Sequence, residues 1–210
     1  MFEFLSNVPL QNKTTFRIGG LARRYVAPAD EGEIRAAVDH ARSNSLPVLV
    51  LGRGSNVLIS DAGWPGLVID IAASFSAIRW DGLVVTARAG APLDALVQEA
   101  VFRGCAGLEE LSGIPGSVGG AVVMNAGAFS TCIADTIEKA TYLAMDDLSM
   151  VTLAAAELGF GYRKSVLQTR KAVVLSAQFR LMPGDAGKLR QIRSGILEKR
   201  RDKQPLDLPN

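Results

Sequence analysis

Residues 113 to 128 read GIPGSVGGAVVMNAGA, with five glycines in sixteen positions. Glycine weakens helices and strands alike, because the backbone entropy lost on folding is not offset by side-chain packing. A segment this poor in side chains is typical of a place where a flat or charged ligand lies against bare backbone. The alternative is tight packing of two backbones against each other, and the segment alone leaves both interpretations open.

Composition and charge describe an ordinary globular chain. Its 210 residues are 48% hydrophobic and 21% charged, with a formal net charge of +2, which suits one large domain or two small ones. No block of like charge predicts a nucleic-acid or membrane surface, and the basic run Lys199 to Arg201 is interpreted as a solvated helix end. No apolar run reaches the ~18 residues of a membrane span, and the N-terminus lacks a signal-peptide pattern.

Cysteine and histidine are scarce. The chain has two cysteines, Cys105 and Cys132, and one histidine, His40, in a surface-helix pattern. This is too few residues for a disulfide scaffold or a metal cluster, so we expect no bound metal. A reducing, cytoplasmic location is the expectation.

Hydrophobic spacing predicts mixed helices and strands. In the first part of the chain, Ile34, Ala37, Val38 and Ala41 recur at helical spacing behind acidic residues, which predicts an amphipathic helix. Strands are predicted at 24–28, 48–51, 57–59, 66–71, 83–90, 135–146, 148–153 and 172–182. Further helices are predicted at 91–104, at 118–125 behind a Ser117 cap, and after residue 183, ending before Pro205.

The order of these elements predicts an α+β fold, because strands and helices do not alternate strictly. We divide the chain into two α+β units, at 1–75 and 76–182. Residues 183–210 form a C-terminal helix and a linker in this interpretation.

The segment LGRGSNVLI at 51–59 is the first candidate ligand site. Its glycines, Gly52 and Gly54, leave a strand, and a turn of this kind aims several backbone N–H groups at one point, where they bind phosphate oxygens. Ser55 and Asn56 add side-chain donors. It is neither a Walker loop nor a Rossmann fingerprint, since no Gly-Lys-Ser/Thr and no helix follow. An ordinary tight turn between strands is the alternative.

The glycine-rich segment 113–128 is the second candidate. A helix beginning after Ser117 and beside glycines is an anion site, and small residues at 119–121 and 126–128 let a planar ring or a pyrophosphate approach closely. Two such turns, one in each half of the chain, predict a long ligand with a pyrophosphate middle in the seam between the halves. A dinucleotide fits that description.

A third motif, LGFGYRKS at 158–165, places Tyr162 and Arg163 after a Gly-Phe-Gly turn. Arginine is suited to a bidentate grip on a carboxylate. A surface loop with an exposed arginine explains the same residues, and composition alone favours it.

Taken together and in order, several segments resemble one enzyme family. These are NKTTFRIGG, LGRGSNVLISDAGWPGLVI, GLEELSGIPGSVGGAVVMNAGAF, ELGFGYRKS and RRDKQPLDLP. They are similar to the UDP-N-acetylmuramate dehydrogenases, also called UDP-N-acetylenolpyruvoylglucosamine reductases. The resemblance runs from about residue 5 to the last residue.

This resemblance implies an FAD-binding fold of the vanillyl-alcohol-oxidase (PCMH) type, with non-covalent FAD between two α+β subdomains. It implies a hydride from NADPH that passes through the flavin to UDP-N-acetylenolpyruvoylglucosamine, a step in peptidoglycan synthesis and so in cell shape and division. Arg163 matches the catalytic, substrate-binding arginine of the family, and Tyr162 matches its substrate-binding neighbour. The implied cofactor-binding residues are Gly52, Arg53, Gly54, Ser55, Asn56, Val57, Leu58, Gly113, Ile114, Pro115, Gly116, Ser117, Gly119, Gly120, Ala121, Asn125, Ala126 and Gly127.

The chain also departs from the family pattern. The family continues after this point with a Gly-Ser segment, whose serine donates a proton, and with a domain that carries a catalytic glutamate and much of the substrate site. The sequence stops at Pro209-Asn210, so we expect little or no reductase turnover from it alone. Arg53 and Cys132 are smaller departures. The alternatives are a non-catalytic flavin-binding module and an FAD-linked sugar or alcohol oxidase of the same wider fold.

Overall fold

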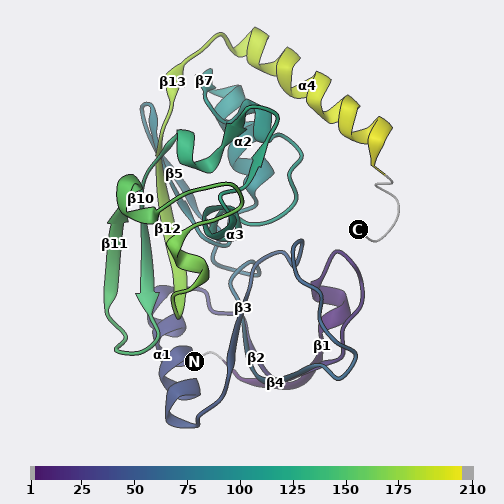
Figure 1. Cartoon of the computed structure of the whole chain (residues 1–210), viewed down its shortest axis with the longest axis vertical. Helices are drawn as coiled ribbons and strands as arrows, with labels where there is room; N and C mark the ends of the chain where they lie inside the picture. Colours follow the sequence, from purple (N-terminus) through teal and green to yellow (C-terminus); the bar gives the residue numbers. More distant parts are fainter. Residues whose placement is uncertain (1–2, 205–210) are drawn as a thin grey trace.

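The computed structural model describes residues 3–204, which form two sheets with four α-helices (Figure 1). The strands are β1 (Leu5–Pro9), β2 (Leu21–Val26), β3 (Val48–Leu51), β4 (Trp64–Asp70), β5 (Ile78–Asp81), β6 (Val84–Arg88), β7 (Cys105–Ala106), β8 (Gly127–Ala128), β9 (Thr131–Cys132), β10 (Ile137–Ala144), β11 (Met150–Ala154), β12 (Ala172–Arg180) and β13 (Met182–Pro183). The helices are α1 (Glu31–Ser43), α2 (Leu93–Phe102), α3 (Val118–Met124) and α4 (Ala186–Lys203). Short 3-10 turns cover Leu10–Lys13, Glu109–Leu111, Ile133–Asp135, Ala155–Leu158 and Val166–Gln168.

The first sheet has the strand order β1-β2-β4-β3. β4 pairs in parallel with β2 and with β3, so the chain needs a crossover, and α1 supplies it. Asp30 caps α1 by accepting a hydrogen bond from the Glu33 N–H at 2.8 Å, as the acidic start of the helix predicts. Its predicted apolar face is buried.

The strand predicted at 57–59 is wrong, because the chain there is irregular. β4 already fills the position between β2 and β3, so no sheet edge is left for this segment. It runs beside residues 19–20 instead, where the Gly20 N–H donates to the Ser60 carbonyl at 2.9 Å. Ile59 is buried in that position, and Leu58 is exposed.

The second sheet is antiparallel throughout, in the order β11-β10-β12-β6-β5. The predicted hairpin at 135–153 is confirmed as β10 and β11, and the predicted strand at 172–182 is confirmed as β12. Sequence reasoning missed β1 and β5, whose residues alternate too weakly to predict a strand. The predicted stop of the last helix at Pro205 lies outside the described residues.

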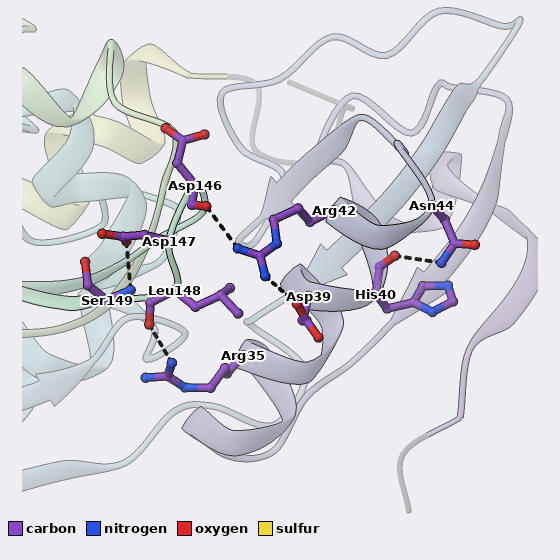
Figure 2. Close-up of polar contacts among 9 residues, drawn as sticks. All are labelled: Arg35, Asp39, His40, Arg42, Asn44, Asp146, Asp147, Leu148 and Ser149. Atoms are coloured by element: carbon purple, nitrogen blue, oxygen red, sulfur yellow. Dashed lines mark hydrogen bonds and ion pairs between the residues drawn. The ribbon is translucent and has the colours of Figure 1, made fainter.

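Helix α1 joins the two sheets. Its buried residues belong to the same hydrophobic core as β6, β10 and β12, so one continuous core spans both halves. Arginines on its outer face reach the turn between β10 and β11, as Figure 2 shows. Arg35 donates to the Leu148 carbonyl at 2.5 Å, and Arg42 donates to the Asp146 carbonyl at 3.0 Å. The two sheets are therefore closed against each other on the α1 side.

Within residues 3–204, no helix has both the length and the apolar character needed to cross a bilayer.

Candidate functional site

A cleft of about 740 Å³ lies where the two halves of the chain meet, within the usual size range of a cofactor pocket. The loop after β3 lines one side, and the loop into α3 together with α3 itself lines the other. The structure brings most of the sequence-predicted residues together here, namely Gly52, Arg53, Gly54, Ser55, Asn56, Val57, Ile114, Pro115, Gly116, Ser117, Gly119, Gly120, Ala121, Ala126, Gly127 and Arg163.

The first side is the turn 52–56. Gly54 has φ +67°, and a Cβ there would lie 2.0 Å from the Lys13 carbonyl oxygen, so only glycine fits. Within the described part of the chain, the N–H groups of residues 53–56 donate no hydrogen bond to other protein atoms. These free donors, grouped in one turn beside the cleft, suit an anionic ligand.

The second side, around the start of α3, is built differently. Ser117 caps the helix as predicted, accepting a hydrogen bond from the Gly120 N–H at 3.3 Å. The first N–H groups of the helix are already used, because Val118 donates to the Ala91 carbonyl and Gly119 to the Ala89 carbonyl, each at 2.8 Å. This side therefore offers the cleft a bare glycine and alanine surface more than a set of donors.

The two sides touch at one edge of the cleft. The Ser55 hydroxyl donates to the Pro115 carbonyl at 3.2 Å. A Cβ on Gly52 would lie 2.3 Å from the Ser117 Oγ, and one on Gly116 would lie 2.9 Å from the Ser55 Oγ. The glycines thus allow both close backbone contact and an open cleft beside it, so the two readings left open for segment 113–128 both apply.

A buried polar cluster supports the first turn from below. Asp70, at the end of β4, is 4% exposed and accepts hydrogen bonds from the Tyr25 hydroxyl at 2.6 Å and from the Lys13 ammonium at 3.2 Å. Burial raises the pKa of the Tyr25 hydroxyl, and the hydrogen bond to Asp70 raises it further. Burial opposes the charge on Lys13, but its contacts with Tyr25 and Asp70 raise its pKa on balance.

Three arginines line the cleft, Arg53, Arg163 and Arg200, and the described lining residues include no carboxylate. The electrostatic character of the cleft therefore favours an anion. The Arg163 guanidinium donates to the Gly127 carbonyl at 2.8 Å and lies 5.6 Å from the Tyr162 ring centre.

Arg200 reaches the cleft from α4, contrary to the interpretation of its basic run as a solvated helix end. Its Nε donates to the Ser112 carbonyl at 2.8 Å, and burial lowers the pKa of its guanidinium. Nearby, Arg193 holds Asp94 through two hydrogen bonds of 2.6 and 2.8 Å. Burial alone would raise the pKa of Asp94, but the bonds from Arg193 and the Gly113 N–H lower it on balance.

Four predicted residues do not line the cleft. The Leu58 side chain is 73% exposed, and the Tyr162 side chain is 93% exposed. A Cβ on Gly113 would meet the Arg200 and Leu197 side chains 2.9 Å away, so this glycine makes room for α4. Asn125 is 7% exposed, and its amide is engaged with the Gly161 carbonyl and the Ala134 N–H.

Sequence reasoning missed the floor of the cleft. The additional lining residues are Val50, Leu51, Ile71, Val123, Met124, Ala128, Leu167, Gln168, Ala172, Val174 and Arg200. Most are apolar residues of strands and of α3, and nothing in their local sequence separates a core position from a cleft position.

Comparisons with known proteins agree with this geometry. The FAD binding domain family matches residues 22–152. A UDP-N-acetylenolpyruvoylglucosamine reductase of Synechococcus sp. (strain WH7803) is 42% identical over 97% of the chain and 67% of the relative. The reductase of Agathobacter rectalis is 40% identical over 98% of the chain and 69% of the relative. The chain thus spans about two thirds of the length of these relatives.

Solved structures give the same result. The crystal structure of the reductase from Thermus caldophilus superimposes with a TM-score of 0.80 at 33% identity, over 98% of this chain and 71% of that one. Cholesterol oxidase from Brevibacterium sterolicum superimposes with a TM-score of 0.66 at 13% identity, over 87% of this chain and 38% of that one, which shows a common fold alone. The predicted α+β FAD-binding fold of the vanillyl-alcohol-oxidase type is confirmed.

Proposed function

This chain belongs to the UDP-N-acetylenolpyruvoylglucosamine reductase family, and on that premise we propose that it is the FAD-binding part of such a reductase. Its substrate in this proposal is UDP-N-acetylenolpyruvoylglucosamine, the hydride donor is NADPH, and the reaction serves peptidoglycan precursor synthesis. We also propose a cytoplasmic location, which agrees with the two unpaired cysteines.

The residues of the cleft fit a dinucleotide. The free N–H groups at 53–56 suit a pyrophosphate, and the bare surface from Gly116 to Ala121 suits a flat ring system. When bound, the flavin supplies hydride transfer, from NADPH to the substrate. None of the described lining residues is a cysteine or a histidine, which supports non-covalent binding.

Arg163 has the position required of a substrate-binding cation. Its guanidinium lies on the cleft beside the glycine-rich side, tied to the Gly127 carbonyl. There it would hold the substrate carboxylate and stabilise the negative charge that develops on it during reduction. Tyr162, on the outside of the same turn, would contact substrate over its exposed ring.

The observation that carries the proposal is the cleft between two glycine turns, and Gly120 allows a direct test. Gly120 lines the cleft and lies in α3, and a Cβ there would meet its closest neighbour, the Ser117 Oγ, at an ordinary 3.4 Å. Gly120→Leu should therefore fold while its side chain fills the ligand space. We expect FAD titration, followed by flavin absorbance, to show at least a tenfold weaker affinity than in the wild-type chain.

Gly195→Leu is the matched control, because Gly195 is also helical, with nothing within 4 Å of an added Cβ. It should bind FAD as the wild-type chain does. Equal flavin binding by wild-type and Gly120→Leu would contradict a site in this cleft, and a wild-type chain that takes up no FAD would overturn the proposal as a whole.

The NADPH assignment needs its own test. In the FAD-loaded chain under anaerobic conditions, we expect NADPH to bleach the flavin absorbance faster than NADH does. A faster reaction with NADH would contradict this part of the proposal.

A further inference from the structure

Tyr162 and Arg163 lie in a tight turn that the chain does not adopt without support. Gly161 and Lys164 exchange backbone hydrogen bonds, at 3.0 and 3.2 Å, across the turn. Arg163 has φ +54°, a left-handed conformation that is unfavourable for a residue with a long side chain. Such a conformation persists only where neighbouring groups hold it.

Asn125 is the buried group that holds the turn. It ends α3 with φ +44°, and its Nδ2 donates to the Gly161 carbonyl at 3.0 Å. Its Oδ1 accepts from the Ala134 N–H at 3.0 Å. A carbonyl only accepts and an N–H only donates, so these two partners fix the orientation of the amide and leave it no free group for a ligand.

Two further side chains fasten the same turn to the same segment. The Ser165 hydroxyl donates to the Val123 carbonyl at 2.7 Å. Gln168 Nε2 donates to the Arg163 carbonyl at 2.9 Å and lies 3.2 Å from the Met124 sulfur. Together with the bond from Arg163 to Gly127, every one of these ties leads to residues 123–127 or to Arg163 itself.

The other end of that segment forms the second side of the cleft. Helix α3 spans only Val118–Met124, so its start borders the cofactor space while its end carries the arginine turn. A short hydrogen-bonded helix moves as one piece. The position of the arginine is thereby linked to the surface against which the flavin lies.

We propose that Asn125 is a positioning residue that couples the cofactor side of the cleft to Arg163, and not a flavin ligand. This rests on the proposed function only in that the cleft holds FAD. It differs from the expectation that Asn125 contacts the cofactor, and from a role as a helix cap alone, because it requires the effect of Asn125 to act through Arg163.

Asn125→Gly tests this with little disturbance of the backbone, since glycine accepts φ +44° and the change adds no charge. The first measurement is amide hydrogen exchange in the 210-residue chain. We expect exchange at Gly161 and Lys164 to become at least tenfold faster than in the wild-type chain, as the turn opens. Asn44→Gly is the matched control, because Asn44 also ends a helix, and its Nδ2 also donates to a backbone carbonyl, that of His40, far from the cleft (Figure 2).

The second measurement separates positioning from mere stability. A cation on the cleft favours the anionic reduced flavin, so Arg163→Ala should lower the midpoint potential of bound FAD. We expect Asn125→Gly to lower it by part of that shift, and to have no further effect in the Arg163→Ala background. Asn44→Gly should leave the potential unchanged.

The outcomes are distinct. Unchanged exchange at Gly161 and Lys164 in Asn125→Gly, or a potential shift that persists in full in the Arg163→Ala background, would overturn the proposal. If the wild-type chain takes up no FAD, the proposed function fails, and the exchange measurement alone decides whether Asn125 holds the turn. If Asn125→Gly does not fold, Gln168→Ala carries the same two measurements, because Gln168 is exposed and its loss leaves α3 intact.

Discussion

The two sides of the cleft are both rich in glycine, yet they offer a ligand different things. The turn 52–56 leaves its N–H groups free, while α3 spends its first N–H groups on the Ala89 and Ala91 carbonyls. The first turn can therefore recognise charge, and the second provides shape. Two segments with the same composition differ because one leaves a parallel sheet and the other begins a helix docked against a neighbouring strand end.

The largest expected effect is on the first side, at Gly54. Gly54→Ala places a methyl group against the Lys13 carbonyl and forces a left-handed backbone, which by itself costs about 1–2 kcal/mol. We expect a loss of unfolding free energy in urea larger than that, together with loss of FAD binding.

Gly82→Ala isolates the backbone cost. Gly82 has φ +57° and nothing within 4 Å of an added Cβ. If Gly54→Ala were no more destabilising than Gly82→Ala, the close contact with Lys13 would not matter to the shape of the first turn.

The next effect concerns the polar cluster beneath the same turn. Asp70→Ala leaves the buried Tyr25 hydroxyl without its acceptor, and we expect a loss of about 1–3 kcal/mol in urea unfolding. The double variant Asp70→Ala with Tyr25→Phe should recover part of this loss, because neither member of the pair then remains unsatisfied. A double variant as unstable as the sum of the two single ones would refute this account.

On the second side, the helix cap is the sensitive point. Ser117→Ala should cost about 1 kcal/mol through loss of the N-cap, and Asp30→Ala at the start of α1 should cost a similar amount. Only Ser117 lines the cleft, so only its variant should also weaken FAD binding. Equal flavin affinities for both variants would show that the cap supports the helix without shaping the site.

The smallest effect is pH-dependent and concerns the attachment of α4 beside the second side. The pKa of Asp94 is lowered in the folded chain, so its contribution to stability is complete above about pH 4 and is lost as the pH falls through the lowered pKa. The carboxylate is partly exposed, so we expect less than about 1 kcal/mol. The stability difference between wild-type and Asp94→Asn should therefore shrink from pH 5 to pH 3, and a constant difference would contradict this.

Local sequence determined more of the second side than of the first. The Ser117 cap, α3 and the β10–β11 hairpin follow from signals within a few residues, namely a capping side chain, helical spacing and a turn between alternating strands. The irregular path of 57–59 could not be predicted, because its β-branched residues read as a strand until β4 is known to occupy the only place in the sheet.

The sequence by itself determined the fold class, the family and the two glycine turns, because these depend on residue type and order along the chain. Tertiary structure decided which groups face the ligand. Asn125 is turned inward to Gly161, Arg200 is brought in by a helix 75 residues further along, and the N–H groups of α3 are consumed by a distant strand end. Hydrogen-bond partners far apart in sequence leave no local pattern, so only the folded chain shows which donors remain free.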